Sequence, residues 1–413
     1  MENRSQKEIQ LGLSRIKAVA ERLDLLTPKS VVITVGGTNG KGSTVAMLEA
    51  IYCEAGYCVG AYTSPHLLYF NERIRLNRQN ISDLSVCEAF LIIEQARGSI
   101  HLTYFEMATL AALLYFKQSK TDLIILEVGM GGRLDATNII DSDLAIISTI
   151  ALDHQDYLGT TLDAIGYEKA GILRSNKTLI YSDTSIPATI TKKADDLNVR
   201  TLCLNRDFSY EMSDTQLTII FSTGESLVLP RPGIHPKAAV AGVIASRCLM
   251  TLLPVLPQFL ERAIKKVYIA GRQQVIYGTI CTVLDVSHNP QSVNALVERI
   301  KRLKVTGKIH AVFSGFKDKD LYGLISPMST YVDHWYSAAL DCERGATESM
   351  LMGAFQQVAV DIDLQFCRSI TDAYQMAFNH ANFGDVIVVY GSFFVVGPII
   401  LDNQKKEGWI CSG

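Results

Sequence analysis

The sequence predicts an α/β protein of two domains, each built on a mostly parallel β-sheet covered by helices. Its 413 residues exceed what a single hydrophobic core usually holds, which favours two domains. Short apolar runs alternate with helical patterns and glycine-rich turns, as they do in β-α-β units. Most of these runs are continuously apolar, and burial on both faces of a parallel sheet explains that pattern.

The first α/β series starts with VVITV at 31–35, followed by a helix over 43–55 that ends at Gly56. Two runs within 216–230 resemble a hairpin that turns at Thr223 and Gly224, and a helical pattern follows Lys237. Further strands are expected in this series at 58–64, 122–129, 143–152 and 178–182.

The second α/β series begins near Gly271 and includes a helix over 292–303. Its strands are expected at 279–287, 308–316, 333–339, 364–369 and 385–392. The change of series places the domain boundary within 266–272, so the expected domains are residues 1–268 and 269–413.

Composition and charge argue against several classes of protein. The net charge is −3 and no block of five or six like charges occurs, so no nucleic-acid partner is expected. The start, MENRSQKEIQ, lacks an apolar signal core, and the longest apolar run, 107–116, is too short to span a bilayer. Nine cysteines occur without a C-x-x-C pair, as expected for reduced thiols in a cytoplasmic protein without membrane partners.

A glycine-rich loop, GGTNGKG, joins the strand at 31–35 to the following helix. Backbone N–H groups of such a loop, the helix start and Lys41 can together bind phosphate oxygens. Ser43 and Thr44 supply hydroxyls for Mg²⁺, one position later than in the usual G-x-x-x-x-G-K-[ST] pattern. The pattern predicts a nucleoside triphosphate site; the alternative is a tight turn with a solvated lysine.

Two further side chains follow strands of the same predicted sheet. Glu127 ends one buried strand and His154 follows another, so both are expected at the carboxyl edge, near Ser43. Oxygen ligands with one imidazole suit Mg²⁺ or Mn²⁺ better than Zn²⁺. The alternatives are a buried salt bridge of Glu127, with Arg133 as one candidate partner, and an ordinary core or surface role for His154.

Several motifs in fixed order resemble those of folylpolyglutamate synthases and the bifunctional dihydrofolate synthase/folylpolyglutamate synthases, relatives of the Mur ligases. The resemblance runs from about residue 30 to about residue 400, and the family's phosphate loop, G-T-N-G-K-G-[ST], carries the same extra glycine. The motifs are GTNGKGS (37–43), TSPHL (63–67), LTYFE (102–106), EVGMGGRLDATN (127–138), ALDH (151–154), EKAGI (168–172), GR (271–272) and LDVSHNP (284–290).

The resemblance implies a P-loop ATPase-like domain of the Mur-ligase central-domain type, which binds ATP and a pterin, over 1–268. It implies a smaller, Rossmann-like glutamate-ligase domain over 269–413. The implied enzyme is a monomeric ligase that uses ATP and Mg²⁺, with a second Mg²⁺ and K⁺ as further candidates. It would add L-glutamate to 7,8-dihydropteroate and to reduced folates through an acyl phosphate.

The resemblance also assigns nucleotide and metal residues. Lys41 would act on the phosphates, and Lys169 would be a carbamate in place of an ordinary solvated helix lysine. The implied metal ligands are Ser43, Ser64, Glu127 and His154, the last also a catalytic candidate. The implied nucleotide-binding residues are Thr38, Asn39, Gly40, Lys41, Gly42, Ser43, Lys237, Arg272 and Asp285.

Substrate residues are implied in three segments. Tyr104 and Phe105 would pack against a pterin and Asp135 would accept hydrogen bonds from its ring; the alternative is that the two aromatic residues begin a helix and fill the core. The implied set is Thr103, Tyr104, Phe105, Glu106, Leu134, Asp135 and Ala136, with His288 and Asn289 positioning glutamate or nucleotide.

Two positions depart from the family pattern. Lys237 stands where an ATP-contacting asparagine is common, so it either makes its own phosphate or ribose contact or marks a different grip on the nucleotide. Gln273 in GRQQ replaces a common aromatic residue and is expected to loosen packing at the hinge.

Three other functions stay open. The first is a monofunctional folylpolyglutamate synthase, and the second is a non-catalytic ATP-binding module. The third is a Mur-type ligase acting on a cell-wall nucleotide precursor. Only about 30 residues precede the first strand, which argues against the UDP-binding domain that this third function needs.

Overall fold

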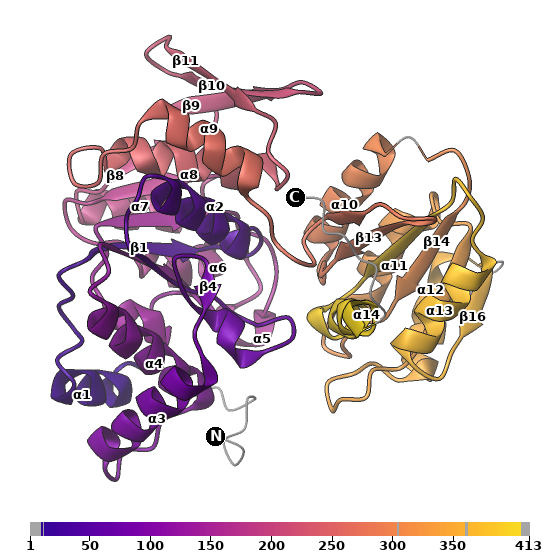
Figure 1. The fold of residues 1–413 in the computed structure, drawn as a ribbon, viewed down its shortest axis with the longest axis horizontal. Helices are drawn as coiled ribbons and strands as arrows, with labels where there is room; N and C mark the ends of the chain where they lie inside the picture. Colours follow the sequence, from indigo (N-terminus) through magenta and orange to yellow (C-terminus); the bar gives the residue numbers. More distant parts are fainter. Residues whose placement is uncertain (1–9, 11, 304, 360–361, 406–413) are drawn as a thin grey trace. The chain divides into compact units, whose positions relative to one another are not determined.

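The chain divides into two compact units, Met1–Tyr268 and Ile269–Gly413. The computed structural model describes residues 10, 12–303, 305–359 and 362–405 (Figure 1). The first nine residues lie outside this part. The prediction that the start lacks a signal core rests on their sequence alone. None of the described helices combines the length and the apolar character that crossing a bilayer requires.

An eight-stranded sheet forms the centre of the first unit. Its inner strands are parallel, as predicted, because β-α-β connections return each strand to the same edge. The two strands at one end are antiparallel, which the sequence did not predict. The strand order is β4 (Gln79–Asn80), β3 (Ile74–Leu76), β2 (Val59–Tyr62), β5 (Leu123–Glu127), β1 (Val31–Gly36), β6 (Leu144–Ile147), β7 (Thr178–Tyr181) and β8 (Arg200–Cys203).

Helices cover both faces of this sheet (Figure 1). One face carries α2 (Lys41–Glu54), α8 (Pro236–Cys248) and α9 (Pro257–Lys266), and α2 contacts both of the other helices. The opposite face carries α1 (Ser14–Arg22), α3 (Asp83–Arg97), α4 (Tyr104–Ser119), α6 (Leu162–Ala170) and α7 (Ala188–Asp196). Short segments complete the unit: η1 (Phe70–Arg73), η2 (Ala136–Ile139) and α5 (Gln155–Leu158).

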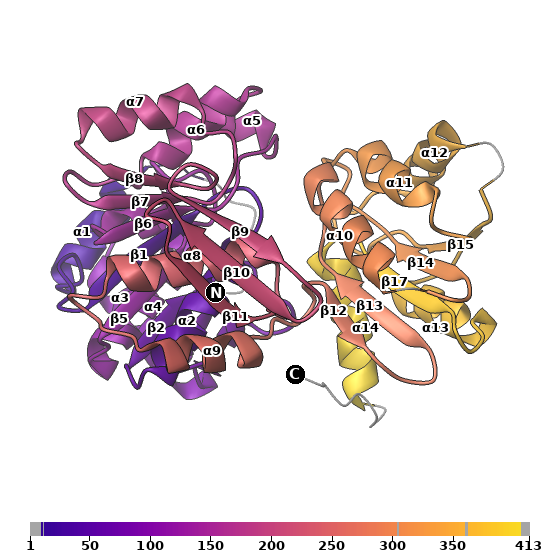
Figure 2. The same ribbon diagram turned by 90° about the horizontal axis from the view of Figure 1, so that it is seen from above.

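A small antiparallel sheet packs on the α9 side of the first unit (Figure 2). The predicted hairpin is confirmed as β10 (Gln216–Phe221) and β11 (Ser226–Pro230), which pair from Gln216–Pro230 to Ile220–Ser226. A third strand, β9 (Phe208–Met212), pairs with β10 and was missed because FSYEM is short and partly polar.

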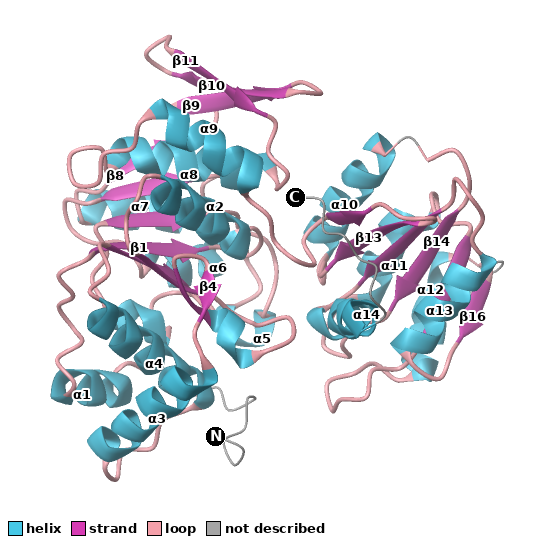
Figure 3. Cartoon of the chain, viewed as in Figure 1, coloured by secondary structure: helices cyan, strands magenta, loops and turns pink. Residues whose placement is uncertain are grey.

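The second unit has a six-stranded sheet flanked by helices (Figure 3). The order is β12 (Gln274–Ile276), β13 (Cys281–Asp285), β17 (Val386–Tyr390), β14 (Ile309–Phe313), β15 (His334–Ser337) and β16 (Leu364–Phe366), parallel except for β12. The helices are α10 (Pro290–Arg302), α11 (Leu321–Ser329), α12 (Glu348–Val358), α13 (Ile370–His380) and α14 (Phe393–Lys405). The predicted α/β class is therefore confirmed in both units.

The strand register brings the functional loops to one edge of each sheet. In the first unit Val35 pairs with Glu127, Gly36 with Ile147, and Ile147 with Tyr181. The loops after β1, β5, β6 and β7 therefore leave from the same, carboxyl edge, where open α/β sheets bind ligands.

Candidate active site

The glycine loop between β1 and α2 has the backbone shape of a phosphate-binding turn. Gly37 has φ 136° and Gly40 has φ 83°, values that favour glycine. A Cβ atom on Gly37 would also overlap the side chain of Ser148. Two of the predicted glycines are thus required by the turn itself, whatever it binds.

Hydrogen bonds from the neighbouring loop hold the first half of this turn. The N–H of Thr38 donates to Thr149 O at 2.7 Å, and that of Asn39 donates to Thr149 Oγ1 at 3.0 Å. The Ser148 hydroxyl donates to Asn39 O at 2.6 Å. The first-turn N–H groups of α2, from Lys41 to Ser43, have no preceding helical acceptor and suit an anion.

Lys41 bends back over its own loop. Its Nζ donates to Gly37 O at 3.1 Å and to Thr38 O at 3.2 Å. The ammonium group therefore lies beside the glycine turn, where it can exchange these carbonyl contacts for phosphate oxygens.

Glu127 lies beside the phosphate loop, as its place at the carboxyl end of its strand predicted, and it contacts Ser64. The Ser64 N–H donates to Glu127 Oε2 at 3.2 Å, and a Cβ atom on Gly42 would lie 3.6 Å from the same oxygen. The alternative salt bridge between Glu127 and Arg133 is wrong, because Arg133 pairs with Glu168 at 2.8 Å. Glu127 is only 4% exposed, which suits a carboxylate that faces a cation.

His154 lies on the loop after β6, in a left-handed conformation with φ 50°. Its side chain is 40% exposed, and Nε2 lies 4.0 Å from Asp153 Oδ2. No group of three or more His, Cys, Asp or Glu side chains within the described ranges is arranged to hold a metal ion. Of the predicted ligands, Ser43, Ser64 and Glu127 offer the hard oxygen donors that Mg²⁺ prefers. Metal binding by these three residues and His154 stays a prediction.

Lys169 is buried near Lys41, which the sequence alone did not predict. It lies on α6 and is only 3% exposed. Burial, and then the positive charge of Lys41, lower the pKa of Lys169 to about 7, while Asp153 and Asp135 act in the opposite direction. Its ammonium form is thus disfavoured near neutral pH. The alternative of a solvated helix lysine is wrong.

The predicted substrate segment at the start of α4 forms a helix cap. Thr103 Oγ1 accepts from the Glu106 N–H at 3.2 Å, and Glu106 Oε2 accepts from the Thr103 N–H at 2.8 Å. Tyr104 is 9% exposed, and the Phe105 ring lies 5.9 Å from the Tyr62 ring. The helix start expected as the alternative is therefore present, and pterin binding stays a prediction.

Asp135 organises the loop between β5 and η2. Its carboxylate accepts from Met130 N at 2.9 Å and from Thr137 N and Oγ1 at 3.0 and 2.7 Å. Burial raises the pKa of Asp135 above its ordinary value, and these hydrogen bonds offset only part of that rise. Its neighbours Leu134 and Ala136 are half-buried and buried. A pterin contact by these three residues stays a prediction.

Lys237 is held by a carboxylate that the sequence did not single out. It follows Pro236 at the start of α8, and its Nζ lies 2.7 Å from Oδ1 of Asp183, just after β7. Asp183 holds the lysine beside the loop after β7; whether Lys237 also contacts the nucleotide stays a prediction.

In the second unit, the Asp285 carboxylate accepts from Gln273 N and Ser287 N, both at 2.7 Å. Burial raises the pKa of Asp285, against the effect of nearby Arg272, whose guanidinium lies 5.2 Å from the Phe393 ring centre. Gln273 Nε2 donates to Ala295 O at 3.2 Å.

His288 and Asn289 follow directly after this strand end. Asn289 caps α10 by accepting from Ser292 N at 3.0 Å, and His288 Nδ1 lies 3.0 Å from Val286 O. Both residues therefore have local structural contacts, and a ligand contact stays a prediction.

Two serines at the same edge were missed. Ser314 and Ser392 follow β14 and β17, and their buried hydroxyls have no hydrogen-bond partner among the described residues. Asp285, Tyr390 and Phe313 are neighbours in register, so both serines lie near Asp285. The sequence could have indicated them, because each serine follows a continuously apolar strand, at the edge where ligands bind.

Comparisons with known proteins agree with this arrangement. Residues 35–228 match the model of the Mur ligase middle domain, and residues 271–393 match that of the Mur ligase glutamate ligase domain. The dihydrofolate synthase/folylpolyglutamate synthase of Escherichia coli K12 is 38% identical over 99% of this chain and 95% of its own length.

Two solved structures extend this similarity to the fold. E. coli FolC in complex with DHPP and ADP superposes with a TM-score of 0.93 at 38% identity, over 98% of this chain and 96% of that one. A bifunctional folylpolyglutamate synthase/dihydrofolate synthase with Mn, AMPPNP and L-glutamate bound has a TM-score of 0.90 at 38% identity, over 97% and 96% of the two chains.

Proposed function

Because the chain belongs to the dihydrofolate synthase/folylpolyglutamate synthase family of Mur-type ligases, we propose that it adds L-glutamate to 7,8-dihydropteroate and to reduced folates in ATP-dependent reactions. One observation carries the proposal for this chain. The phosphate turn, Lys41, Glu127 and Ser64 meet at the carboxyl edge of one sheet, as phosphoryl transfer requires.

The chemistry has two steps. A carboxylate oxygen of the acceptor forms a bond to the γ-phosphorus of ATP, and ADP leaves with the bonding electrons. The amino group of glutamate then attacks the acyl carbon, phosphate leaves and the amine loses one proton. The protein positions these groups and neutralises the phosphate charge.

Each predicted residue has a proposed task. Lys41 and the N–H groups from Gly40 to Ser43 bind the β- and γ-phosphates, with Thr38 and Asn39 shaping the loop. Bound Mg²⁺ would supply positive charge against the phosphate oxygens, held by Ser43, Ser64, Glu127 and His154. Tyr104, Phe105 and Asp135 would contact the pterin. The proposed glutamate and nucleotide residues of the second unit are Arg272, Asp285, His288, Asn289, Ser314 and Ser392.

Lys169 is proposed to act as a carbamate. Its burial and the nearby charge of Lys41 favour the neutral amine, which is the form that adds CO₂. The carbamate forms by N–C bond formation with release of one proton, and it converts a buried cation into an anion that can orient a metal ion or the acyl phosphate.

The partners are small molecules, and we propose a monomer in the cytoplasm. The described cysteines are free thiols, eight in number, which supports a reducing compartment.

Phosphate release by the purified protein with MgATP and L-glutamate tests the function. One sample receives 7,8-dihydropteroate, one a reduced monoglutamyl folate, and one neither. Release with both acceptors is expected, whereas release with the folate alone would indicate the monofunctional synthase. Release with neither acceptor would contradict glutamate addition to folates, and it would favour a ligase acting on a cell-wall nucleotide precursor or a non-catalytic ATP-binding module.

A further inference from the structure

Arg73 is a buried cation without a carboxylate partner among the residues that the structure describes. It is the last residue of η1 and only 7% exposed. Its Nε donates to His66 Nδ1 at 2.8 Å, and its guanidinium carbon lies 5.4 Å from the centre of the Tyr104 ring. Within residues 10, 12–303, 305–359 and 362–405, no acceptor binds its Nη1 or Nη2 and no acid pairs with it.

Two carboxylates that contact the segment from Leu67 to Arg78 are committed elsewhere. Glu72 accepts from the N–H groups of Leu67, Leu68 and Tyr69 at 2.6 to 2.8 Å. Glu49 pairs with Arg75 at 2.9 Å. The partly buried Arg75 is thus neutralised by a carboxylate, whereas no carboxylate of the described residues pairs with Arg73. The Nη1 and Nη2 donors of Arg73 can therefore bind a partner from outside the chain.

Arg73 also lies in a suitable place. Its carbonyl oxygen accepts from Thr63 N at 2.9 Å, and Thr63 precedes Ser64, whose N–H donates to Glu127. Its side chain extends to Tyr104 at the start of α4. The backbone is therefore fixed at the phosphate-loop edge of the sheet, while the guanidinium lies beside Tyr104, in the segment predicted to contact the acceptor substrate.

We propose that Arg73 binds the carboxylate of the acceptor substrate and positions it for attack on ATP. This inference rests on the proposed function. His66 holds Nε and the Tyr104 ring supports one face, so the edge with Nη1 and Nη2 presents parallel N–H donors. That edge matches the two oxygens of a carboxylate. Arg73 exchanges no proton: it offsets the acceptor's charge, which would otherwise repel the phosphates.

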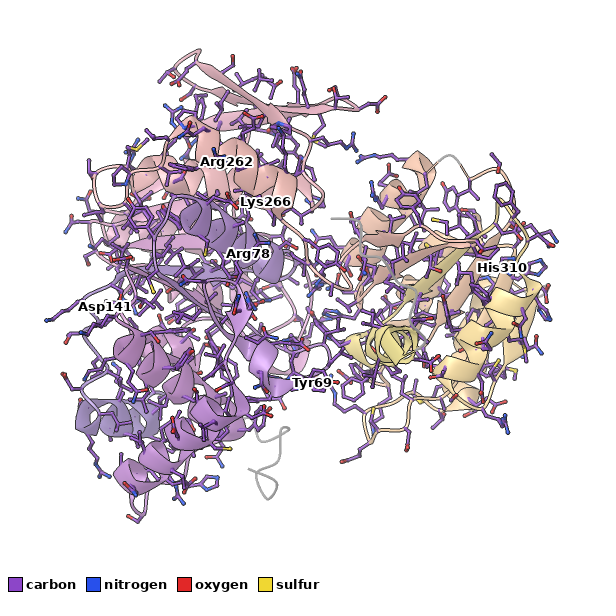
Figure 4. All side chains as sticks on the ribbon, viewed as in Figure 1. Tyr69, Arg78, Asp141, Arg262, Lys266 and His310 are labelled. Atoms are coloured by element: carbon purple, nitrogen blue, oxygen red, sulfur yellow. The ribbon has the colours of Figure 1, made fainter. Side chains whose placement is uncertain are left out.

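The test uses calorimetry to compare the affinity for 7,8-dihydropteroate with the affinity for its neutral carboxamide analogue. The wild type is expected to bind the acid at least tenfold more tightly than the amide. Arg73→Gln should bind both as weakly as the wild type binds the amide. Arg78→Gln is the matched control, since Arg78 is exposed on the turn between β3 and β4 (Figure 4) and should keep the full preference.

Two outcomes would overturn the inference: equal affinity of the wild type for acid and amide, or an undiminished preference in Arg73→Gln. If Arg73→Gln does not fold, Arg73→Lys keeps the charge without the paired donors. The affinity of Arg73→Lys for the acid should fall more than its affinity for the amide. Unchanged affinities in this variant would also count against the inference. Absence of dihydropteroate-dependent phosphate release in the wild type would contradict the proposed function instead.

Discussion

Single side chains at the edge of the first sheet take their chemistry from neighbours far away in the sequence. Lys41 and Lys169 are 128 positions apart by their numbers, yet the charge of one lowers the pKa of the other. Glu127 meets Ser64 because β2 and β5 are adjacent and parallel. The residue types suggested a phosphate site, and strand pairing placed them together.

At this scale, Lys41→Ala should lower phosphate release by about 10²–10³-fold, because one preorganised cation at the transferring phosphate is lost. The melting temperature should stay close to that of the wild type, since the hydrogen bonds from Lys41 Nζ to Gly37 O and Thr38 O lie within its own loop. Lys192→Ala, an exposed lysine on α7, is the control and should retain full turnover. Undiminished turnover in Lys41→Ala would exclude this lysine from catalysis.

Whole elements explain why some predicted substrate residues are where they are. Thr103 and Glu106 form a reciprocal cap that starts α4, and this fixes Tyr104 and Phe105 at the sheet edge. A Cβ atom on Gly129 would lie 2.5 Å from the Phe105 ring, so the loop after β5 packs closely on this helix start. The cap therefore positions the aromatic residues, whether or not Thr103 itself touches a substrate.

Thr103→Ala should destabilise the protein by about 1 kcal/mol, because the Glu106 N–H loses its acceptor. It should also raise the KM for dihydropteroate through displacement of Tyr104, and Thr103→Ser should restore both values. Thermal unfolding and steady-state kinetics measure the two effects. Thr347→Ala removes the cap of α12 in the second unit and is the control: it should lower stability and leave that KM unchanged.

At the scale of the whole molecule, each unit has its own hydrophobic core, and the second also contains a histidine cluster around the buried His310. His310 on β14 (Figure 4) lies 3.3 Å from Asp385, 3.4 Å from the Tyr336 hydroxyl and 5.0 Å, ring to ring, from His334. These residues line a cavity of about 460 Å³. Its full lining is Lys308, His310, His334, Trp335, Tyr336, Asp363, Gln365, His380, Asn382 and Asp385.

This cluster should make the second unit less stable in acid. Burial lowers the pKa of His310 below its ordinary 6.5, more than Asp385 raises it. As the pH falls below 6.5, the unfolded chain takes up a proton more readily than the folded unit, so stability is lost. Unfolding followed by fluorescence of Trp335, which is buried in this unit's core, should show a falling midpoint between pH 7.5 and pH 5.5.

His310→Gln removes the titrating group and keeps a donor toward Asp385, so its midpoint should vary less with pH than that of the wild type. His101→Gln, an exposed histidine of the first unit, should leave the pH dependence of the second unit unchanged. An equally steep dependence in His310→Gln would assign the effect to another group.

The sequence by itself determined the two α/β series, the phosphate loop and the order of the motifs. These features are local: strand burial, glycine turns and helix starts depend on residues that are neighbours along the chain. The short strands β3 and β4, of three and two residues, escaped prediction because so few residues carry no periodicity.

Only the tertiary structure decided which side chains meet. It gave Lys237 its partner Asp183, buried Lys169 near Lys41, and placed Arg73 beside the Tyr104 ring with no acid from the described residues. None of these pairs is visible in a local pattern, since each joins segments that are distant in the sequence. Their proximity follows from strand order and register, and burial then sets the charge that each group can carry.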